Sequence, residues 1–211
     1  MGPSGRHGAY SAVVPFPSPP WSLRAEAWLS LFVLPSSAGP AHPAGVYGAA
    51  FADYREGGAL TYHELLVGRL ARPGLAPGVR ITDIWVDSPE SMAGGRALWA
   101  LPKQLAELPL RRGGAGPLTR TSFEARAEGR RLASGTFTAL PGAAVLRTPY
   151  RAVTCQERAD GAGVVTPLRG SARVVPCHAA WAFDADGPLW FLNGRRPLAT
   201  LLLRDVRLQF G

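Results

Sequence analysis

Residues 119–139 read TRTSFEARAEGRRLASGTFTA and carry the clearest structural signal in the chain. Small or apolar side chains alternate with polar ones on both sides of Glu128-Gly129. A period of two residues is typical of a β-strand with one buried face, and a glycine turn between two such runs predicts a hairpin. We therefore expect paired antiparallel strands over residues 119–127 and 131–139.

The same alternation recurs along most of the chain. In residues 60–66, LTYHELL, a regular strand places Tyr62 and Glu64 on one face and His63 on the other. Further strands are expected at residues 27–34, 79–87, 145–155, 170–183 and 198–210, the last after an Asn193-Gly194 turn. The 25 Gly and 20 Pro leave little room for long helices. These patterns predict a mainly β fold with few short helices, a closed and mostly antiparallel β-barrel, because closure removes exposed strand edges.

Length and composition describe a single globular domain. The chain has 211 residues, of which 46% are hydrophobic and 18% charged, which suits one core and excludes a wholly disordered chain. Residues 1–20 hold four prolines between positions 15 and 20 and are expected to form a flexible N-terminal arm. Residues 21–211 show no linker and no repeat, so we expect one domain. The longest apolar run is too short for a membrane-spanning helix.

The positive charge of the chain does not indicate nucleic-acid binding. Lys and Arg number 23 against 15 Asp and Glu, which gives a net charge of +8. The arginines are dispersed, in runs no longer than doublets such as Arg111-Arg112, without zinc-ligand spacing or an aromatic single-strand motif. We therefore expect neither nucleic acid nor membrane as a partner. The charge favours solubility and the attraction of anionic substrates.

One basic residue stands apart, because Lys103 is the only lysine of the chain. Arginine stays protonated, whereas a buried lysine can lose its proton and form an imine with a carbonyl group. Composition alone leaves open a surface lysine kept by chance. In residues 91–108, SMAGGRALWALPKQLAEL, Pro102 fits the first position of a helix that Pro109 ends, which places Lys103 in the first turn. There the helix dipole and apolar neighbours such as Trp99 would favour the neutral amine.

The segment around Lys103 resembles the acetoacetate decarboxylase-like superfamily. Residues 85–108, WVDSPESMAGGRALWALPKQLAEL, have that family's spacing from an acidic residue through Gly95-Arg96 to Pro102-Lys103. Upstream, Tyr62 and Glu64 in LTYHELLV match the family's strand with its active-site glutamate. The resemblance is dense between these two segments and weakens toward the C-terminus.

This resemblance implies the family's closed β-barrel and a cofactor-independent enzyme. In the family, the lysine after the proline attacks a ketone and forms a Schiff base, an electron sink for breaking or making a carbon-carbon bond. Carried over to this chain, Lys103 is the nucleophile and Glu64 a proton-transfer or orienting group. The candidate substrate-binding residues are Arg96, Tyr62, Trp99 and Arg24. The resemblance further implies a small keto acid or other keto compound as substrate, a homo-oligomer, and no metal.

Two departures from the family pattern leave the reaction open. Gln104 stands where acetoacetate decarboxylases have a second lysine, whose charge would disfavour protonation of Lys103. Residues 46–52 offer no second acid beside Glu64. We expect a carbon-carbon lyase that decarboxylates a β-keto acid. The alternatives are a Schiff-base aldolase, dehydratase or cyclase of a keto substrate, or a non-catalytic barrel that binds an apolar keto or acyl ligand.

Other conspicuous residues have simpler expected roles. Gly94-Gly95-Arg96 could form an anion-binding nest or a tight turn, and we expect the turn. His63 faces away from Glu64 and is expected to be structural. Cys155 and Cys177 are too few for a disulfide scaffold, so we expect buried thiols in a cytoplasmic protein.

Overall fold

The computed structural model describes residues 14–71, 77–114, 120–140 and 146–211. The strands in these residues are β1 (Trp21–Leu34), β2 (Gly45–Arg55), β3 (Tyr62–Ala71), β4 (Gly78–Val86), β5 (Lys103–Leu105), β6 (Leu110–Gly113), β7 (Arg120–Ala127), β8 (Arg130–Ala139), β9 (Arg147–Glu157), β10 (Gly163–Phe183) and β11 (Ala199–Phe210). The helices are α1 (Pro89–Trp99) and the short 3-10 helix η1 (Trp190–Leu192). Neither helix has the length and apolar character needed to cross a membrane.

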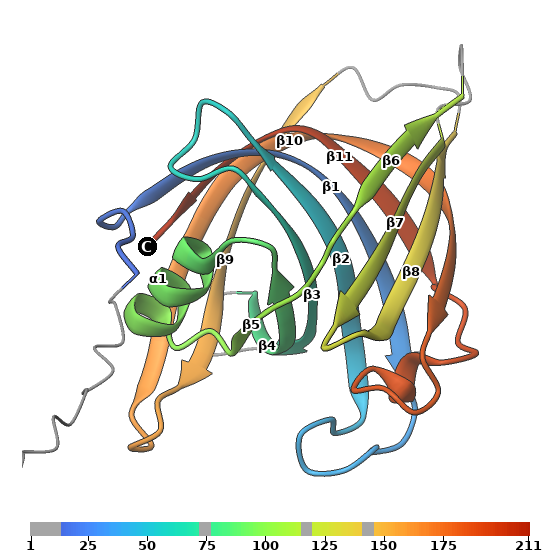
Figure 1. Cartoon of the computed structure of the whole chain (residues 1–211), viewed down its shortest axis with the longest axis horizontal. Helices are drawn as coiled ribbons and strands as arrows, with labels where there is room; N and C mark the ends of the chain where they lie inside the picture. Colours follow the sequence, from blue (N-terminus) through green and yellow to red (C-terminus); the bar gives the residue numbers. More distant parts are fainter. Residues whose placement is uncertain (1–13, 72–76, 115–119, 141–145) are drawn as a thin grey trace, which may run out of the picture.

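Seven strands close into a ring in the order β11, β1, β2, β3, β4, β9, β10 and back to β11 (Figure 1). Neighbouring strands are antiparallel except β4 and β9, which run parallel. The ring gives each of these strands a neighbour on both sides, so their edges are not left open for association. The predicted mainly β fold, closed and mostly antiparallel, is confirmed.

The parallel contact between β4 and β9 forms a short seam in the ring. In the described parts of these strands, residues 78–79 pair with residues 153–154. Beside them, the buried Gln156 side chain accepts a hydrogen bond from the Ile81 N–H and donates one to the Ile81 carbonyl, both at 3.0 Å. An amide side chain therefore makes the hydrogen bonds that a paired backbone would make.

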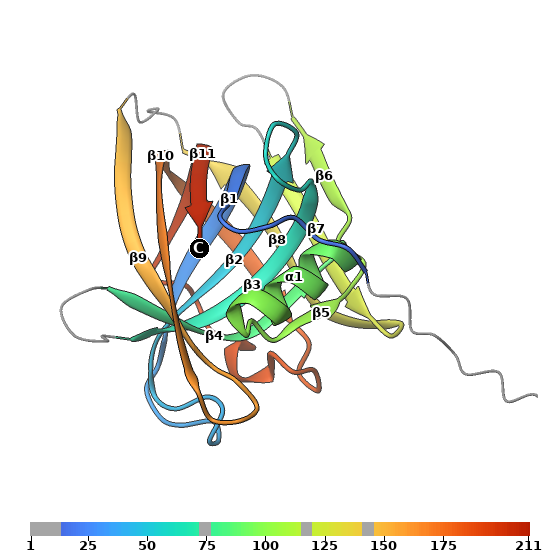
Figure 2. The same cartoon turned by 90° about the vertical axis from the view of Figure 1, so that its left-hand side faces the viewer.

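The long strand β10 joins two layers. Its first part pairs with β9 and β11, and its last part, residues 177–183, pairs with β8. Strands β8, β7 and β6 thereby form a second layer beside β1 and β2 (Figures 1 and 2). Between the layers, Phe51 stacks on Phe123 with 4.2 Å between ring centroids, and Trp28 stacks on Phe137 at 5.7 Å. The larger hydrophobic core therefore lies outside the ring, and the interior of the ring is free to contain a cavity.

A smaller apolar cluster covers one end of the ring, next to α1. Trp99 of α1 packs edge-on against Trp21 of β1 at 4.7 Å and against Phe210 of β11 at 4.6 Å. The C-terminal end of β11 accordingly lies beside α1 (Figure 1). Phe16, within the expected N-terminal arm, packs against this cluster, while residues 1–13 lie outside the described residues.

The strand predictions agree well with the structure. The hairpin around Glu128-Gly129 is confirmed by β7 and β8, and both turn residues have positive φ values, 50° and 74°, as a tight hairpin turn requires. The other predicted strands overlap β1, β3, β4, β9, β10 and β11. Positions 119 and 145, where two strands were expected to begin, lie outside the described residues.

The helix predicted to begin at Pro102 is wrong. The chain forms α1 earlier, with Pro89 in its first turn and with Ser88 as the N-cap, whose Oγ accepts a hydrogen bond from the Ser91 N–H at 3.0 Å. Ala100 adopts the left-handed conformation and ends the helix. Pro102 follows that end, where a proline cannot continue a helix. Lys103 consequently begins β5 and does not lie at a helix N-terminus.

Gly94 and Gly95 form neither a nest nor a tight turn, because both lie inside α1. Each glycine costs a helix interior roughly 0.5–1 kcal/mol relative to alanine. At position 94 this cost is offset by packing, since a Cβ there would stand 2.5 Å from the Trp21 ring. Close packing of α1 against Trp21 therefore requires a residue without a side chain at position 94.

An ionic cluster around His63 connects β2, β3 and the end of β4. His63 Nδ1 lies 2.8 Å from Asp87 Oδ2, and Nε2 lies 3.5 Å from Asp53 Oδ1. Hydrogen bonds to Asp53 and then to Asp87 raise the pKa of His63 to about 9. The hydrogen bond from His63 in turn lowers the pKa of Asp53 well below its usual range. His63 is therefore charged at neutral pH and makes structural contacts.

The His63 cluster should make stability depend on pH. Because the folded pKa of about 9 exceeds the ordinary 6.5, the contribution is fully present below about pH 6.5 and is lost as the pH rises through 9. The His63 side chain is 29% exposed, so solvent screening limits the effect to about 1 kcal/mol. In urea unfolding, the free energy of unfolding of wild type should exceed that of His63→Gln at about pH 6, and this difference should shrink toward about pH 10. His178→Gln, at an exposed histidine, is the control; an advantage that does not vary with pH would contradict this account.

Candidate active site

Lys103 is the first residue of β5, the short strand that follows α1. β5 runs parallel to β4, which puts Lys103 beside Ile84. Strand alternation turns the Lys103 side chain into the ring and the Gln104 side chain outward, so Lys103 is 3% exposed while Gln104 is exposed. The lysine that sequence analysis singled out is therefore buried. A second ammonium at position 104 would lie in solvent, where its effect on Lys103 would be screened.

One face of α1 holds the Lys103 side chain. Ser91, Gly95 and Trp99 recur every fourth residue, so they share a helix face, and all three are buried. A Cβ at position 95 would stand 2.7 Å from Lys103 Cδ and 2.9 Å from Cε. Lys103 Nζ donates a hydrogen bond to Ser91 Oγ at 2.8 Å. The lysine thus lies along the helix, and glycine at position 95 makes room for it.

Glu64 is the ionic partner of Lys103. It lies on the inward face of β3, and its Oε2 is 2.8 Å from Lys103 Nζ, with both side chains almost fully buried. The Tyr54 hydroxyl donates a hydrogen bond to Glu64 Oε1 at 3.3 Å. Nζ also lies 3.5 Å from the Tyr62 hydroxyl and 5.1 Å from the centroid of its ring. Amine and carboxylate are therefore in direct contact, as proton exchange between them requires.

The buried tyrosines beside this pair remain protonated. Burial, and then the negative charge of Glu64, raises the pKa of both Tyr54 and Tyr62 well above its ordinary value of 10. Burial also raises the pKa of Tyr150 to about 12. At physiological pH these hydroxyls can donate hydrogen bonds but cannot act as bases. Lys103 and Glu64 are the other titratable side chains in contact here.

The ion pair lines a cavity of about 490 Å³ inside the ring. Among the described residues, Lys103 and Glu64 are the charged members of its lining, and the other polar side chains are hydroxyls of Tyr and Thr. One of them, Thr154 Oγ1, is buried and has no hydrogen-bond partner in the described part of the chain, so it can bond to a bound molecule. No three His, Cys, Asp or Glu side chains of the described residues gather closely enough to hold a metal ion.

Of the four expected substrate-binding residues, Tyr62 and Trp99 line this cavity and the two arginines do not. Arg96 follows Gly95 on the helix, and this one-residue step turns its side chain away from the cavity. It is exposed, and its Nε donates a hydrogen bond to the Lys103 carbonyl at 2.6 Å. Contrary to expectation, Arg96 supports the backbone of Lys103 and does not reach the cavity.

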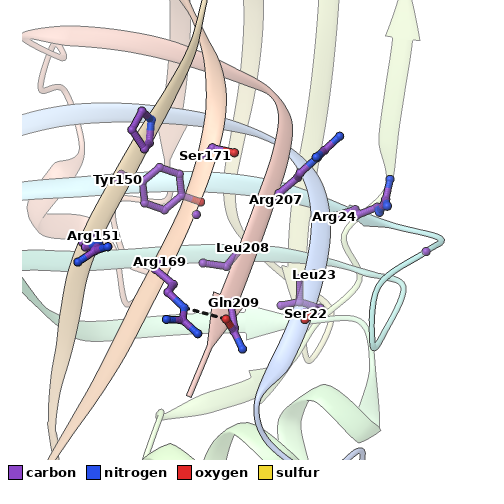
Figure 3. A pocket seen from close by; sticks show the side chains of 13 residues that line it. Ser22, Leu23, Arg24, Tyr150, Arg151, Arg169, Ser171, Arg207, Leu208 and Gln209 are labelled. Atoms are coloured by element: carbon purple, nitrogen blue, oxygen red, sulfur yellow. Dashed lines mark hydrogen bonds between the residues drawn. The ribbon is translucent and has the colours of Figure 1, made fainter.

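Arg24 also lies outside the cavity, because it follows the inward-facing Leu23 in β1 and points to the other face of the strand. It borders an open groove of about 750 Å³ on the outer wall, with Arg151, Arg169 and Arg207 on neighbouring strands (Figure 3). Arg24 therefore does not line the cavity that contains Lys103.

Sequence reasoning missed two members of the site, Ser91 and Tyr54. The four-residue spacing of Ser91, Gly95 and Trp99 was the available signal for the first, once the helix is placed before Pro102. Tyr54 lies on the inward face of β2, next to Tyr62 in the register with β3. Ala52 pairs with Glu64 in that register, so the second acid is indeed absent beside Glu64, and the Tyr54 hydroxyl is its neutral neighbour.

The buried ion pair should show strong coupling in a double-mutant cycle. Removing one partner leaves an uncompensated buried charge, so Lys103→Met and Glu64→Gln should each lower the free energy of unfolding by about 3–5 kcal/mol. The double variant should recover most of that loss, as measured by urea unfolding at neutral pH. Glu124→Gln, which breaks the exposed pair between Glu124 and Arg126, should cost about 1 kcal/mol or less. Single losses no larger than this control would show that the buried pair is not energetically coupled.

Comparison with known proteins places the chain in a family. The family model for acetoacetate decarboxylase (ADC) matches residues 33–158. MppR, an enzyme of enduracididine biosynthesis solved in complex with pyruvate, superposes with a TM-score of 0.70 and 16% identity over 100% of this chain and 96% of its own. Acetoacetate decarboxylase from Legionella pneumophila gives a TM-score of 0.59 and 13% identity over 100% and 95%.

An acetoacetate decarboxylase-like enzyme from Sphingomonas wittichii RW1 gives a TM-score of 0.62 and 18% identity over 90% of both chains. At these identities the likeness concerns the fold. No curated protein sequence matches the chain significantly. The family match, in contrast, extends over more than half of the chain and includes β3, α1 and Lys103. The chain therefore belongs to the acetoacetate decarboxylase family.

Proposed function

We propose that this protein is a cofactor-independent Schiff-base enzyme that decarboxylates a β-keto acid, with Lys103 as the nucleophile. One observation carries the proposal: the only lysine of the chain lies buried in an apolar cavity, 2.8 Å from a buried carboxylate. A buried ion pair is seldom more stabilising than apolar residues of the same volume. Its presence is better explained by chemistry than by folding.

The first half of the reaction forms the imine. Glu64 Oε2 accepts a proton from the Lys103 ammonium, and the neutral Nζ attacks the ketone carbon of the substrate. The resulting hydroxyl group leaves as water, with a proton returned by Glu64, and a protonated imine remains. Ser91 Oγ, 2.8 Å from Nζ, keeps the amine oriented, and the nearby Tyr62 hydroxyl can donate to the substrate oxygen.

The second half breaks the carbon-carbon bond. In the apolar cavity the substrate carboxylate has the protonated imine as its nearest cation, since the lining of described residues holds no arginine. Loss of CO₂ moves the bonding electrons into the imine and replaces two charges with neutral species, which an apolar environment favours. Glu64, which is again a carboxylate after imine formation, takes up a proton from solvent and passes it to the enamine carbon, which gives a protonated imine. Water then hydrolyses this imine and releases the ketone and the Lys103 ammonium.

The same imine also supports aldol, dehydration and cyclisation reactions. MppR has been solved with pyruvate and with the condensation product of pyruvate and an aldehyde, so a keto acid and its product can occupy this fold. A non-catalytic ligand-binding role remains the alternative of a different class. Decarboxylation is favoured here because the cavity is apolar and the described residues of its lining include no second charged pair to hold a polar co-substrate.

Imine formation can be tested by trapping. Wild type treated with acetoacetate or 3-oxooctanoate and sodium borohydride should gain an irreversible mass on Lys103. Trypsin would then fail to cut after position 103, leaving ALWALPKQLAELPLR, residues 97–111, as one modified peptide. Lys103→Arg should keep the fold and gain no mass. No adduct across keto acids of different sizes and a broad pH range would exclude the Schiff-base reaction and favour simple binding.

The proton-transfer role of Glu64 can be separated from its structural role. Glu64→Gln should lower kcat for decarboxylation by about 100-fold to 10,000-fold, because the amide cannot shuttle a proton. Tyr54→Phe, which removes a hydrogen bond to the carboxylate and leaves it charged, should have a smaller effect. Equal losses in the two variants, with both folded by circular dichroism, would argue against proton transfer by Glu64.

A further inference from the structure

The cavity extends well beyond the ion pair, along the inward face of β3. After Glu64, the residues of this face are Leu66, Gly68 and Leu70, and all of them line the same cavity. At about 3.3 Å per residue, Leu70 lies roughly 20 Å along the strand from Glu64. This distance is far greater than acetoacetate needs.

The walls of this extension are aliphatic apart from the hydroxyl of Thr154, which lies beside Val79. They are formed by side chains from the strands around the ring, namely Leu29, Leu31, Val79, Ile81, Val174 and Leu203. No charged residue of the described chain lines this part of the cavity. Because such a surface binds apolar groups and disfavours charged ones, the part of the substrate farthest from the keto acid must be apolar.

Two glycines keep the middle of the extension open. Gly48 of β2 pairs with Gly68 of β3, so neither strand has an inward side chain at this level. A Cβ at Gly68 would stand 2.6 Å from Val79 Cγ1 and 3.1 Å from the Arg80 carbonyl, so packing requires that glycine. At Gly48 the nearest atom would be Leu29 Cδ1, the end of a side chain, at 3.2 Å. Position 48 can therefore accept a side chain, which would project into the cavity.

The two ends of the cavity differ. Near Lys103, the rings of Trp21, Trp99 and Phe210 pack together beside α1. At the far end of β3, Leu70 is 47% exposed, and Val33, two residues beyond Leu31 on β1, is 42% exposed. A molecule whose head reaches Lys103 would thus extend its other end toward this exposed apolar rim.

We infer that the substrate is a β-keto acid with an unbranched aliphatic tail of medium length, which lies along β3 between Lys103 and Leu70, and that Gly48 determines how long a tail is accepted. This inference rests on the proposed function for the identity of the head group. The tail follows independently from the shape and chemistry of the cavity.

The chain-length dependence of decarboxylation tests this inference. Across acetoacetate, 3-oxohexanoate, 3-oxooctanoate and 3-oxodecanoate, kcat/KM should rise by about fourfold per buried methylene until the cavity is filled. In Gly48→Leu, the preference for 3-oxodecanoate over acetoacetate should fall at least about tenfold, since the added side chain occupies the tail position. Gly163→Leu, at an exposed glycine with open space around it, should leave the profile unchanged.

Binding of the product ketones separates this inference from the proposed function. Calorimetric affinities of Lys103→Met for 2-pentanone, 2-heptanone and 2-nonanone should rise with length, and Gly48→Leu in that background should remove the rise. If borohydride traps no keto acid but the ketone affinity still rises with chain length, the Schiff-base proposal fails and the tail site stands. If trapping succeeds but neither kcat/KM nor affinity depends on length, the tail site is wrong and the Schiff-base proposal stands.

Discussion

The 2.8 Å contact between Lys103 Nζ and Glu64 Oε2 sets the requirements that the surrounding structure meets. Two opposite charges taken out of water need good geometry and further hydrogen bonds to offset their desolvation. The Lys103 amine donates one such hydrogen bond to Ser91 Oγ, and the Tyr54 hydroxyl donates another to the Glu64 carboxylate. Helix α1 must therefore lie close to the ring, and Gly95 permits this approach. The position of the helix, the short strand β5 and the register of β3 are all linked to one buried pair.

The two-layer architecture makes such a site compatible with a stable domain. Most large aromatic side chains pack between the ring and β8, β7 and β6 rather than inside the ring. Because the period of a strand is two residues, β3 serves both regions, with Leu65 and Val67 in the outer core and Tyr62 and Glu64 toward the cavity. The stability of the fold therefore does not depend on filling the interior with side chains, which leaves that space for a ligand.

Local pattern was enough to predict most of the long strands and the face of Glu64, because alternation and turn glycines act over a few residues, but it did not predict β2, β5 or β6. It failed for the helix, since Pro89 and Pro102 both fit a first turn and only the Ser88 cap and the left-handed Ala100 distinguish them in the structure. The family resemblance identified Lys103 and Glu64, but not that Arg24 and Arg96 face outward. Ser91 could be found only once the helix was placed before Pro102, and Tyr54 only from the pairing of β2 with β3. No local signal could reveal the division into an outer core and an inner cavity.

The seam between β4 and β9 has a consequence for how the ring is assembled. Its paired residues are about 75 positions apart in the chain, whereas β2 and β3 or β7 and β8 are joined by short turns. Contacts between such distant segments carry a larger loop-closure entropy and tend to form late in folding. In the described residues this seam is held by two residue pairs, the Gln156 side chain and the exposed Arg80–Glu157 ion pair, so it is also where the ring would separate at least cost. Thr154 lies both in this seam and in the cavity wall, so transient separation here would give solvent and ligands a lateral route to the interior while the outer core stays packed.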